Sequence, residues 1–177
     1  MAASTKVLTM LGWLLLLAAV AGSGDASAQQ GQQAQEDKDP IIGTWVLNLA
    51  NSKYVTGQPA KSIVRTFDYT REGMILVTLN SVNAQGVASS NHWYMSLDGK
   101  EHPEYSRARG ATPILWISIK AVDSHTKELT GRRLEGGVMT VVDLMRFSVA
   151  KDGRSMTITY TDAKTGKEGN VIAYDRQ

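Results

Sequence analysis

The stretch from Val138 to Thr161 reads VMTVVDLMRFSVAKDGRSMTITYT, and its pattern decides the fold class. Branched and aromatic residues dominate it, and such residues favour β-strands. Asp152-Gly153 is a tight-turn dipeptide between two such runs. The stretch is therefore predicted to form an antiparallel hairpin, with strands over residues 138–149 and 155–161.

The same pattern continues in both directions along the chain. Seven more segments combine branched or aromatic residues with flanking turn signals: 44–49, 63–70, 74–82, 90–97, 114–122, 127–134 and 170–174. No segment after residue 40 keeps a helical i, i+3, i+4, i+7 stripe over three turns. Short strands at regular spacing are typical of a sandwich or an up-and-down barrel. We predict an all-β, antiparallel up-and-down barrel of about 8–10 strands, because closure removes the exposed edges of a long meander.

The beginning of the chain has a different composition. Lys6 precedes an apolar run over residues 7–21, and Ala26-Ser27-Ala28 supplies the small-x-small pattern that a signal peptidase needs. The run is shorter than the roughly 20 residues of a membrane-spanning helix. The predicted organisation is a cleaved signal peptide, a flexible Gln-rich tail and a barrel domain, over residues 1–28, 29–39 and 40–177. We therefore expect a secreted or periplasmic protein with no membrane anchor after cleavage.

Composition narrows the function classes. The 177 residues include no cysteine, which excludes disulfides, thiolate metal sites and a thiol nucleophile. The formal net charge is only +2, and so weak a charge argues against a nucleic-acid partner. No G-x-S-x-G nucleophile motif occurs. The polar cluster over 98–104, with His102, is compatible with a metal site or with a hairpin tip. We favour the tip and predict no metal and no cofactor.

Several motifs together carry a resemblance to a known family. They are PIIGTWVLNLANSKY at 40–54, LDGKEHP at 97–103, RFSVAKDG at 146–153 and the closing YDRQ at 174–177. This set resembles a family of uncharacterised secreted bacterial proteins of lipocalin-like, calycin type. Gly43-x-Trp45 matches the opening motif of lipocalins, in which the Trp plugs one end of the barrel. The resemblance implies that Arg176 packs on Trp45, and it implies a fold and a compartment but no reaction.

Aromatic residues in the predicted strands have two interpretations. They fill the core, or some of them line a cavity at the open end of the barrel. For the second interpretation we select Tyr69, Tyr94 and Trp116 as an apolar wall. His92 lies two residues from Tyr94 on the same strand face and is assigned as a polar tip beside that wall. Arg146 is assigned as the anchor for an anionic head group.

Charged residues inside strands bear on the same choice. Asp143 and Arg146 interrupt faces of residues 138–149 that are otherwise largely apolar. Each is either solvent-exposed on a twisted strand or a polar anchor inside a pocket. The predicted function is non-catalytic binding of a small amphipathic or hydrophobic molecule, such as a fatty-acid-like one. The alternative is a protein–protein or scaffold module with a solid barrel core, and an enzyme is the third possibility.

The leader generates the first testable prediction. We expect cleavage between Ala28 and Gln29, because the small-x-small pattern ends there. N-terminal sequencing of protein recovered from the periplasm or the medium measures the site directly. Membrane-bound material that still begins at Met1 would contradict it.

Overall fold

The computed structural model describes residues 38–104 and 115–177. The predicted signal peptide and residues 29–37 of the predicted tail lie outside the described residues. The described part contains ten β-strands and no helix, hence no helix able to cross a membrane. The strands are β1 Gly43–Lys53, β2 Ser62–Tyr69, β3 Ile75–Val82, β4 Ala88–Met95, β5 His102–Glu104, β6 Leu115–Ala121, β7 Thr126–Glu135, β8 Val138–Val149, β9 Ser155–Thr161 and β10 Glu168–Arg176.

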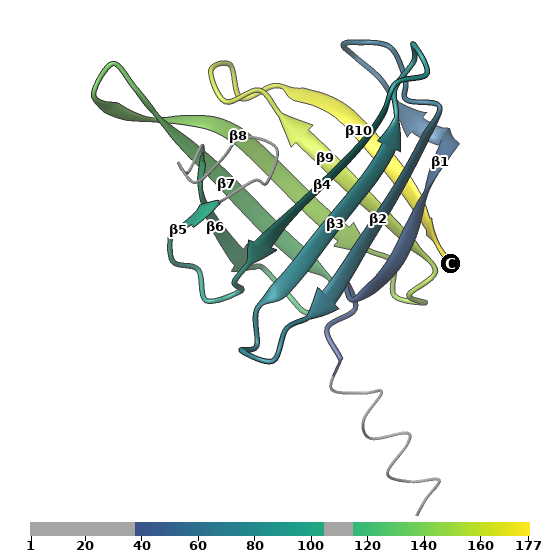
Figure 1. Ribbon diagram of the computed structural model, residues 1–177, viewed down its shortest axis with the longest axis horizontal. Helices are drawn as coiled ribbons and strands as arrows, with labels where there is room; N and C mark the ends of the chain where they lie inside the picture. The colour runs from purple at the N-terminus through teal and green to yellow at the C-terminus, as the bar shows by residue number, and fades with distance from the viewer. Residues whose placement is uncertain (1–37, 105–114) are drawn as a thin grey trace, which may run out of the picture. The chain divides into compact units, whose positions relative to one another are not determined.

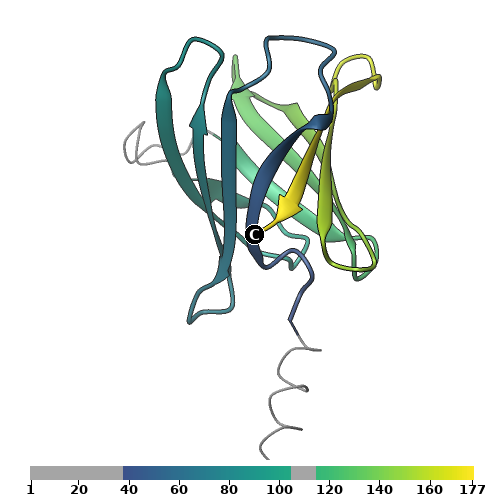
Figure 2. The same ribbon diagram turned by 90° about the vertical axis from the view of Figure 1, so that its right-hand side faces the viewer.

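The ten strands form one antiparallel sheet that curls into a nearly closed barrel (Figure 1, Figure 2). The order across the sheet is β4-β3-β2-β1-β10-β9-β8-β7-β6-β5, so the first and last strands pair with each other. All other ladders join strands that are consecutive in the chain. In the described part no ladder joins β4 to β5, which leaves a single seam. The predicted all-β antiparallel up-and-down barrel is confirmed.

All nine predicted strands are present, with ends shifted by a few residues. The structure adds β5, which the sequence pattern misses because it has only three residues, with Pro103 at its centre. Proline cannot donate a ladder hydrogen bond and is therefore confined to edges and bulges. β5 is such an edge, since it ends the sheet order and its one ladder among the described residues is with β6.

Trp45 and Arg176 close the end of the barrel where β1 begins and β10 ends. Trp45 is completely buried, and its indole N–H donates to the carbonyl oxygen of Ile41 at 2.8 Å. The guanidinium of Arg176 lies 4.2 Å from the centroid of the Trp45 ring, which is a cation–π contact. That guanidinium also donates to three main-chain carbonyl oxygens, those of Pro40, Ile42 and Gly153.

Gly43 makes this arrangement possible. Its φ of +140° lies in a region that residues with a Cβ rarely adopt. A Cβ added at Gly43 would also overlap the Nη1 atom of Arg176. The first residue of the G-x-W motif is therefore glycine because the arginine that covers the Trp occupies the space of its side chain.

The hydrophobic core continues inward from this closed end. Phe67 of β2 and Phe147 of β8 meet edge to face, with ring centroids 6.3 Å apart. They belong to one cluster with Trp45, Tyr174 and Ile41. Edge-to-face pairs are favourable beyond the area that they bury. This cluster bridges opposite walls of the barrel and fills the part of its interior next to the closed end.

One buried ion pair ties the start of the described chain to the barrel. The ammonium of Lys127 lies 3.1 Å from the carboxylate of Asp39 and donates to the carbonyl oxygen of Ser124. Lys127 is almost completely buried, so removing either partner would leave an uncompensated charge. Asp39 is the last residue of the predicted tail, and it is anchored to the barrel by this contact.

Gly43→Ala provides a test of the closed end. We expect it to destabilise the protein by at least about 2 kcal/mol more than Gly73→Ala, because it displaces Arg176 from the ring and from its carbonyl partners. Gly73 is the matched control, since its φ is also positive, +76°, but an added Cβ there meets nothing within 4 Å. Chemical denaturation of both variants measures the difference. Equal losses would show that the Arg176 contact contributes nothing to stability.

Candidate functional site

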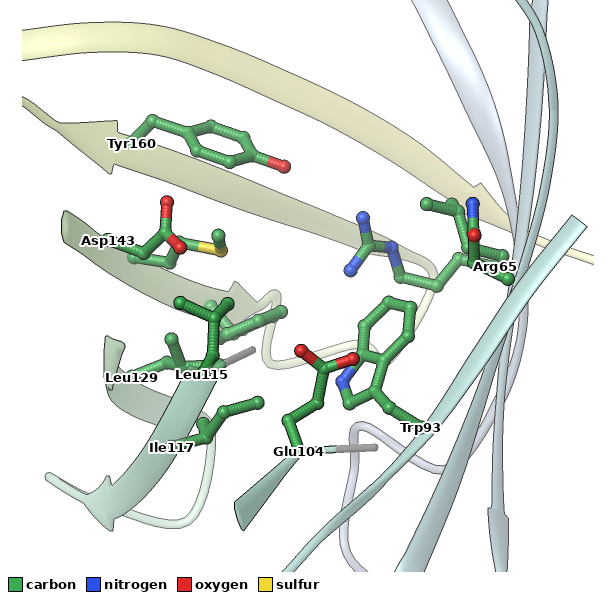
Figure 3. Close-up of a pocket in the computed structure, with 12 residues that line it drawn as sticks. Arg65, Trp93, Glu104, Leu115, Ile117, Leu129, Asp143 and Tyr160 are labelled. Atoms are coloured by element: carbon green, nitrogen blue, oxygen red, sulfur yellow. The ribbon is translucent and has the colours of Figure 1, made fainter. Parts of the chain in front are cut away.

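A cavity of about 330 Å³ lies inside the barrel next to the core. Cavities of this size suit a small organic ligand. The lining is mostly apolar with a few polar groups from different strands (Figure 3). The lining residues are Arg65, Leu79, Asn91, Trp93, Glu104, Leu115, Ile117, Leu129, Asp143, Met145, Phe147 and Tyr160.

Arg65 is the most deeply buried polar group in this lining. It follows Ile63 by two residues and precedes Phe67 by two, so strand alternation turns its side chain inward. Only 5% of the residue is exposed, and its Nε atom has no hydrogen-bond partner among the described residues. Its guanidinium points into the cavity in Figure 3. The strand therefore holds a positive charge inside the barrel with part of its bonding capacity unused.

Two aromatic rings flank this guanidinium. Its central carbon lies 5.7 Å from the ring centroid of Trp93 and 5.8 Å from that of Tyr174. Both distances are within cation–π range. Burial raises the pKa of Tyr174 to about 12, although the nearby charge of Arg65 acts in the opposite direction. The tyrosine is therefore a neutral phenol at physiological pH, and it supplies no negative charge to Arg65.

Asp143 faces Arg65 from the other side of the cavity (Figure 3). It lies on β8 at the same parity as Met145 and Phe147, so it shares the inner face of that strand. Burial raises the pKa of the Asp143 carboxyl, and the positive charge of Arg133 partly opposes this shift. Of the two interpretations of Asp143, the structure supports a polar group inside a pocket.

Of the residues selected from the sequence, His92 and Tyr94 share one strand face as expected, but this face points out of the barrel. Tyr94 is 51% exposed and His92 does not line the cavity. The inward face of β4 carries Asn91, Trp93 and the buried Met95. A shift of one residue exchanges the two faces of a strand. The cavity therefore has Trp93 where the sequence analysis placed Tyr94.

Tyr69, Trp116 and Arg146 also lie outside the cavity lining. Tyr69 is 47% exposed and is the last residue of β2. It lies two residues after Phe67, which pairs with Gly43 at the start of β1. Trp116 lies between Leu115 and Ile117 on the opposite face of β6, because those two neighbours point inward.

Arg146 is exposed on the outer face of β8, and its guanidinium lies 3.6 Å from the carboxylate of Glu128. It borders a separate hollow of about 420 Å³, which Thr159 and Thr161 also line. Of these two arginines, only Arg65 lies in the lining of the cavity inside the barrel. The sequence contained a signal for Arg65, namely its position between two apolar residues of the same face.

The polar cluster over residues 98–104 divides into separate pairs. His102 Nε2 lies 3.0 Å from both carboxylate oxygens of Asp98, and Glu101 pairs with Arg132 at 2.8 Å. Within residues 38–104 and 115–177, no three His, Asp or Glu residues gather in a way that could hold a metal ion.

Asp143→Asn generates a prediction about stability and pH. Because the pKa of Asp143 is raised, the folded state binds this proton more tightly than the unfolded state, and stability falls as pH rises through the raised value. The variant should therefore unfold at a higher temperature than the original protein at pH 7. The difference should vanish below about pH 3.9, the ordinary aspartate pKa, where both states are protonated.

Asp162→Asn is a control that should lower, and not raise, the unfolding temperature at pH 7. Hydrogen bonds from Thr165 and Lys164 lower the pKa of Asp162, so this carboxylate stabilises the fold at pH 7 and loses that effect as pH falls. Thermal unfolding followed by circular dichroism from pH 3 to 8 measures both variants. If Asp143→Asn lowers the unfolding temperature at pH 7, the carboxylate has a stabilising partner and the burial argument is wrong.

Comparisons with known proteins support the fold. No protein-family model and no curated protein matches this chain. Among solved structures, a single-substitution mutant of the fluorescent protein UnaG aligns with 12% identity and a TM-score of 0.51, over 78% of this chain and 96% of that one. Wild-type UnaG aligns with 13% identity and a TM-score of 0.47, over 77% and 97%. At such low identity the likeness concerns the fold alone, an antiparallel β-barrel.

Proposed function

We propose that this barrel binds a small molecule with an apolar body and an anionic or hydrogen-bond-accepting group, without converting it chemically. The observation that carries the proposal is Arg65, a buried arginine that points into a cavity and whose Nε has no partner within residues 38–104 and 115–177. A ligand acceptor at this position would form charge-assisted hydrogen bonds, which are stronger than neutral ones.

The energetics of the cavity support binding. A charged group is costly to bury unless a partner compensates it, so Arg65 is a cost to the empty barrel. The flanking rings of Trp93 and Tyr174 compensate only part of that cost, because a cation–π contact satisfies no N–H donor. Leucine, isoleucine, methionine and phenylalanine side chains supply the remaining wall, where burial of an apolar body is favourable. Affinity would come from this wall and orientation from Arg65.

The cavity also favours binding over the scaffold alternative. A solid interior was the feature expected of a scaffold, whereas this interior has a cavity with polar groups from several strands. As part of the proposal, the predicted leader would place the carrier outside the cytoplasm, in the periplasm or the medium. There it would hold a poorly soluble molecule away from water.

Arg65→Met tests the proposed function. The substitution keeps an apolar stem and removes the charge, so decanoic acid should bind about 10–100-fold more weakly, the usual range for loss of a charged hydrogen bond. Decanol, which lacks the carboxylate, should lose little affinity. Isothermal titration calorimetry measures both ligands.

Arg146→Met is the matched control. It removes an exposed arginine from the outer face of the barrel and should leave both affinities unchanged. A loss confined to Arg146→Met would return the anion anchor to the outer face. Failure of the original protein to bind either compound would refute the carrier.

A further inference from the structure

Two side chains of opposite charge face each other across the cavity without contact. Arg65 belongs to β2 and Asp143 to β8, and three strands separate β2 from β8 in the sheet order. Neighbouring strands lie about 4.8 Å apart, so this separation places the two residues on opposing walls. No ion pair or hydrogen bond joins them among the described residues, and Figure 3 shows the cavity between them. The barrel thus keeps apart two charges that would pair if they were adjacent.

Asp143 is accommodated by a specific feature of the wall. Its ladder partner on β7 is Gly131, and the register shifts immediately after that glycine. A Cβ at Gly131 would lie 3.0 Å from the Cβ of Asp143 and 3.3 Å from its Oδ2 atom. Such contacts are tighter than ordinary packing allows. The carboxylate can lie against the wall because residue 131 has no side chain.

No hydrogen bond or ion pair to the Asp143 carboxylate is found among the described residues. Arg133 acts on it only through its charge, since the Arg133 guanidinium is engaged by Glu135. Tyr160 borders the same part of the cavity, and its hydroxyl points into the interior (Figure 3). A partly buried carboxylate gains most from a donor that a ligand brings, whether an ammonium, an amide N–H or a hydroxyl.

We propose that the ligand is dipolar, with an acceptor group that meets Arg65, an apolar middle, and a hydrogen-bond donor that meets Asp143. This inference rests on the proposed binding function and adds the chemistry of the second end of the ligand. A simple fatty acid does not fit this requirement, because its methyl end would leave the carboxylate of Asp143 dehydrated and without a donor. A molecule with polar groups at both ends satisfies both walls at once.

Matched ligand pairs test the proposal by calorimetry. The pairs are octanoic, decanoic and dodecanoic acid, each against the same acid with an amino group on its last carbon. Three lengths are used so that a poor fit of one chain does not decide the result. An ammonium is costly to bury in an apolar pocket, so a gain from it indicates a specific partner. At the best-fitting length, the original protein should bind the ω-amino fatty acid about tenfold more tightly than the plain fatty acid.

Three variants separate the contributions of the two walls. Asp143→Asn should abolish the preference for the ω-amino fatty acid and leave the affinity for the plain fatty acid unchanged or slightly raised. Arg65→Met should lower the affinity for both ligands of a pair and preserve the ratio of the two affinities. Gly131→Ala should reduce the preference with every charge intact, because it displaces the carboxylate. Thermal unfolding establishes whether each variant is folded. If Gly131→Ala does not fold, Asp143→Asn alone tests the role of the carboxylate.

The outcomes distinguish this inference from the proposed function. If the plain fatty acids bind through Arg65 but bind at least as tightly as the ω-amino fatty acids at all three lengths, the inference of a dipolar ligand is refuted. The proposed binding function then still holds. The same holds if the preference survives Asp143→Asn. If neither kind of acid binds the original protein, the carrier itself is refuted and the dipolar ligand with it.

Discussion

The contact between Arg176 and Trp45 is the constraint on which the rest of the barrel depends. One guanidinium covers a buried indole and, at the same time, holds the carbonyl oxygens of Pro40, Ile42 and Gly153. These carbonyls belong to the segment before β1 and to the turn between β8 and β9. The last strand is thereby fixed to the first, and the pairing of β1 with β10 joins the two halves of the meander. Without this junction, two separate sheets would each have an exposed edge.

Closing one end in this way determines where the interior can be hollow. Trp45, Phe67, Phe147 and Tyr174 are large, and they fill the barrel next to the closure. Farther from it, β2 and β8 continue inward with Arg65 and Asp143, which cannot pack as hydrocarbon does. Charged side chains need space and partners, so the cavity begins where the aromatic core ends. The division into a packed end and a polar cavity follows from the order of residues along these two strands.

The polar residues of the cavity are a local exception to the rules that stabilise the fold. Arg65 is buried, and its Nε has no hydrogen-bond partner in the described part of the chain, while the pKa of Asp143 is raised by burial. Both conditions reduce the stability of the fold, whereas the Arg176 guanidinium donates to three carbonyl oxygens and the Lys127 ammonium pairs with Asp39 and donates to Ser124. Natural proteins tolerate such costs at functional sites. The contrast between these two groups of charges within one small barrel is the physical reason for the proposal that a ligand binds in the cavity.

Alternating residues and turn dipeptides allowed nine of the ten strands to be predicted, because period-two patterns and Asp-Gly turns are local properties of the chain. The resemblance to lipocalins, and not the local pattern, implied that Arg176 packs on Trp45. The sequence also showed that β4 has two faces, but not that Trp93, rather than Tyr94, is inside. That choice is made when the sheet closes, since alternation defines two faces and only curvature decides which of them becomes the interior. The pairing of Gly131 with Asp143 and the position of Arg65 opposite that carboxylate are likewise products of tertiary structure, because they join residues of strands that meet only when the barrel is formed.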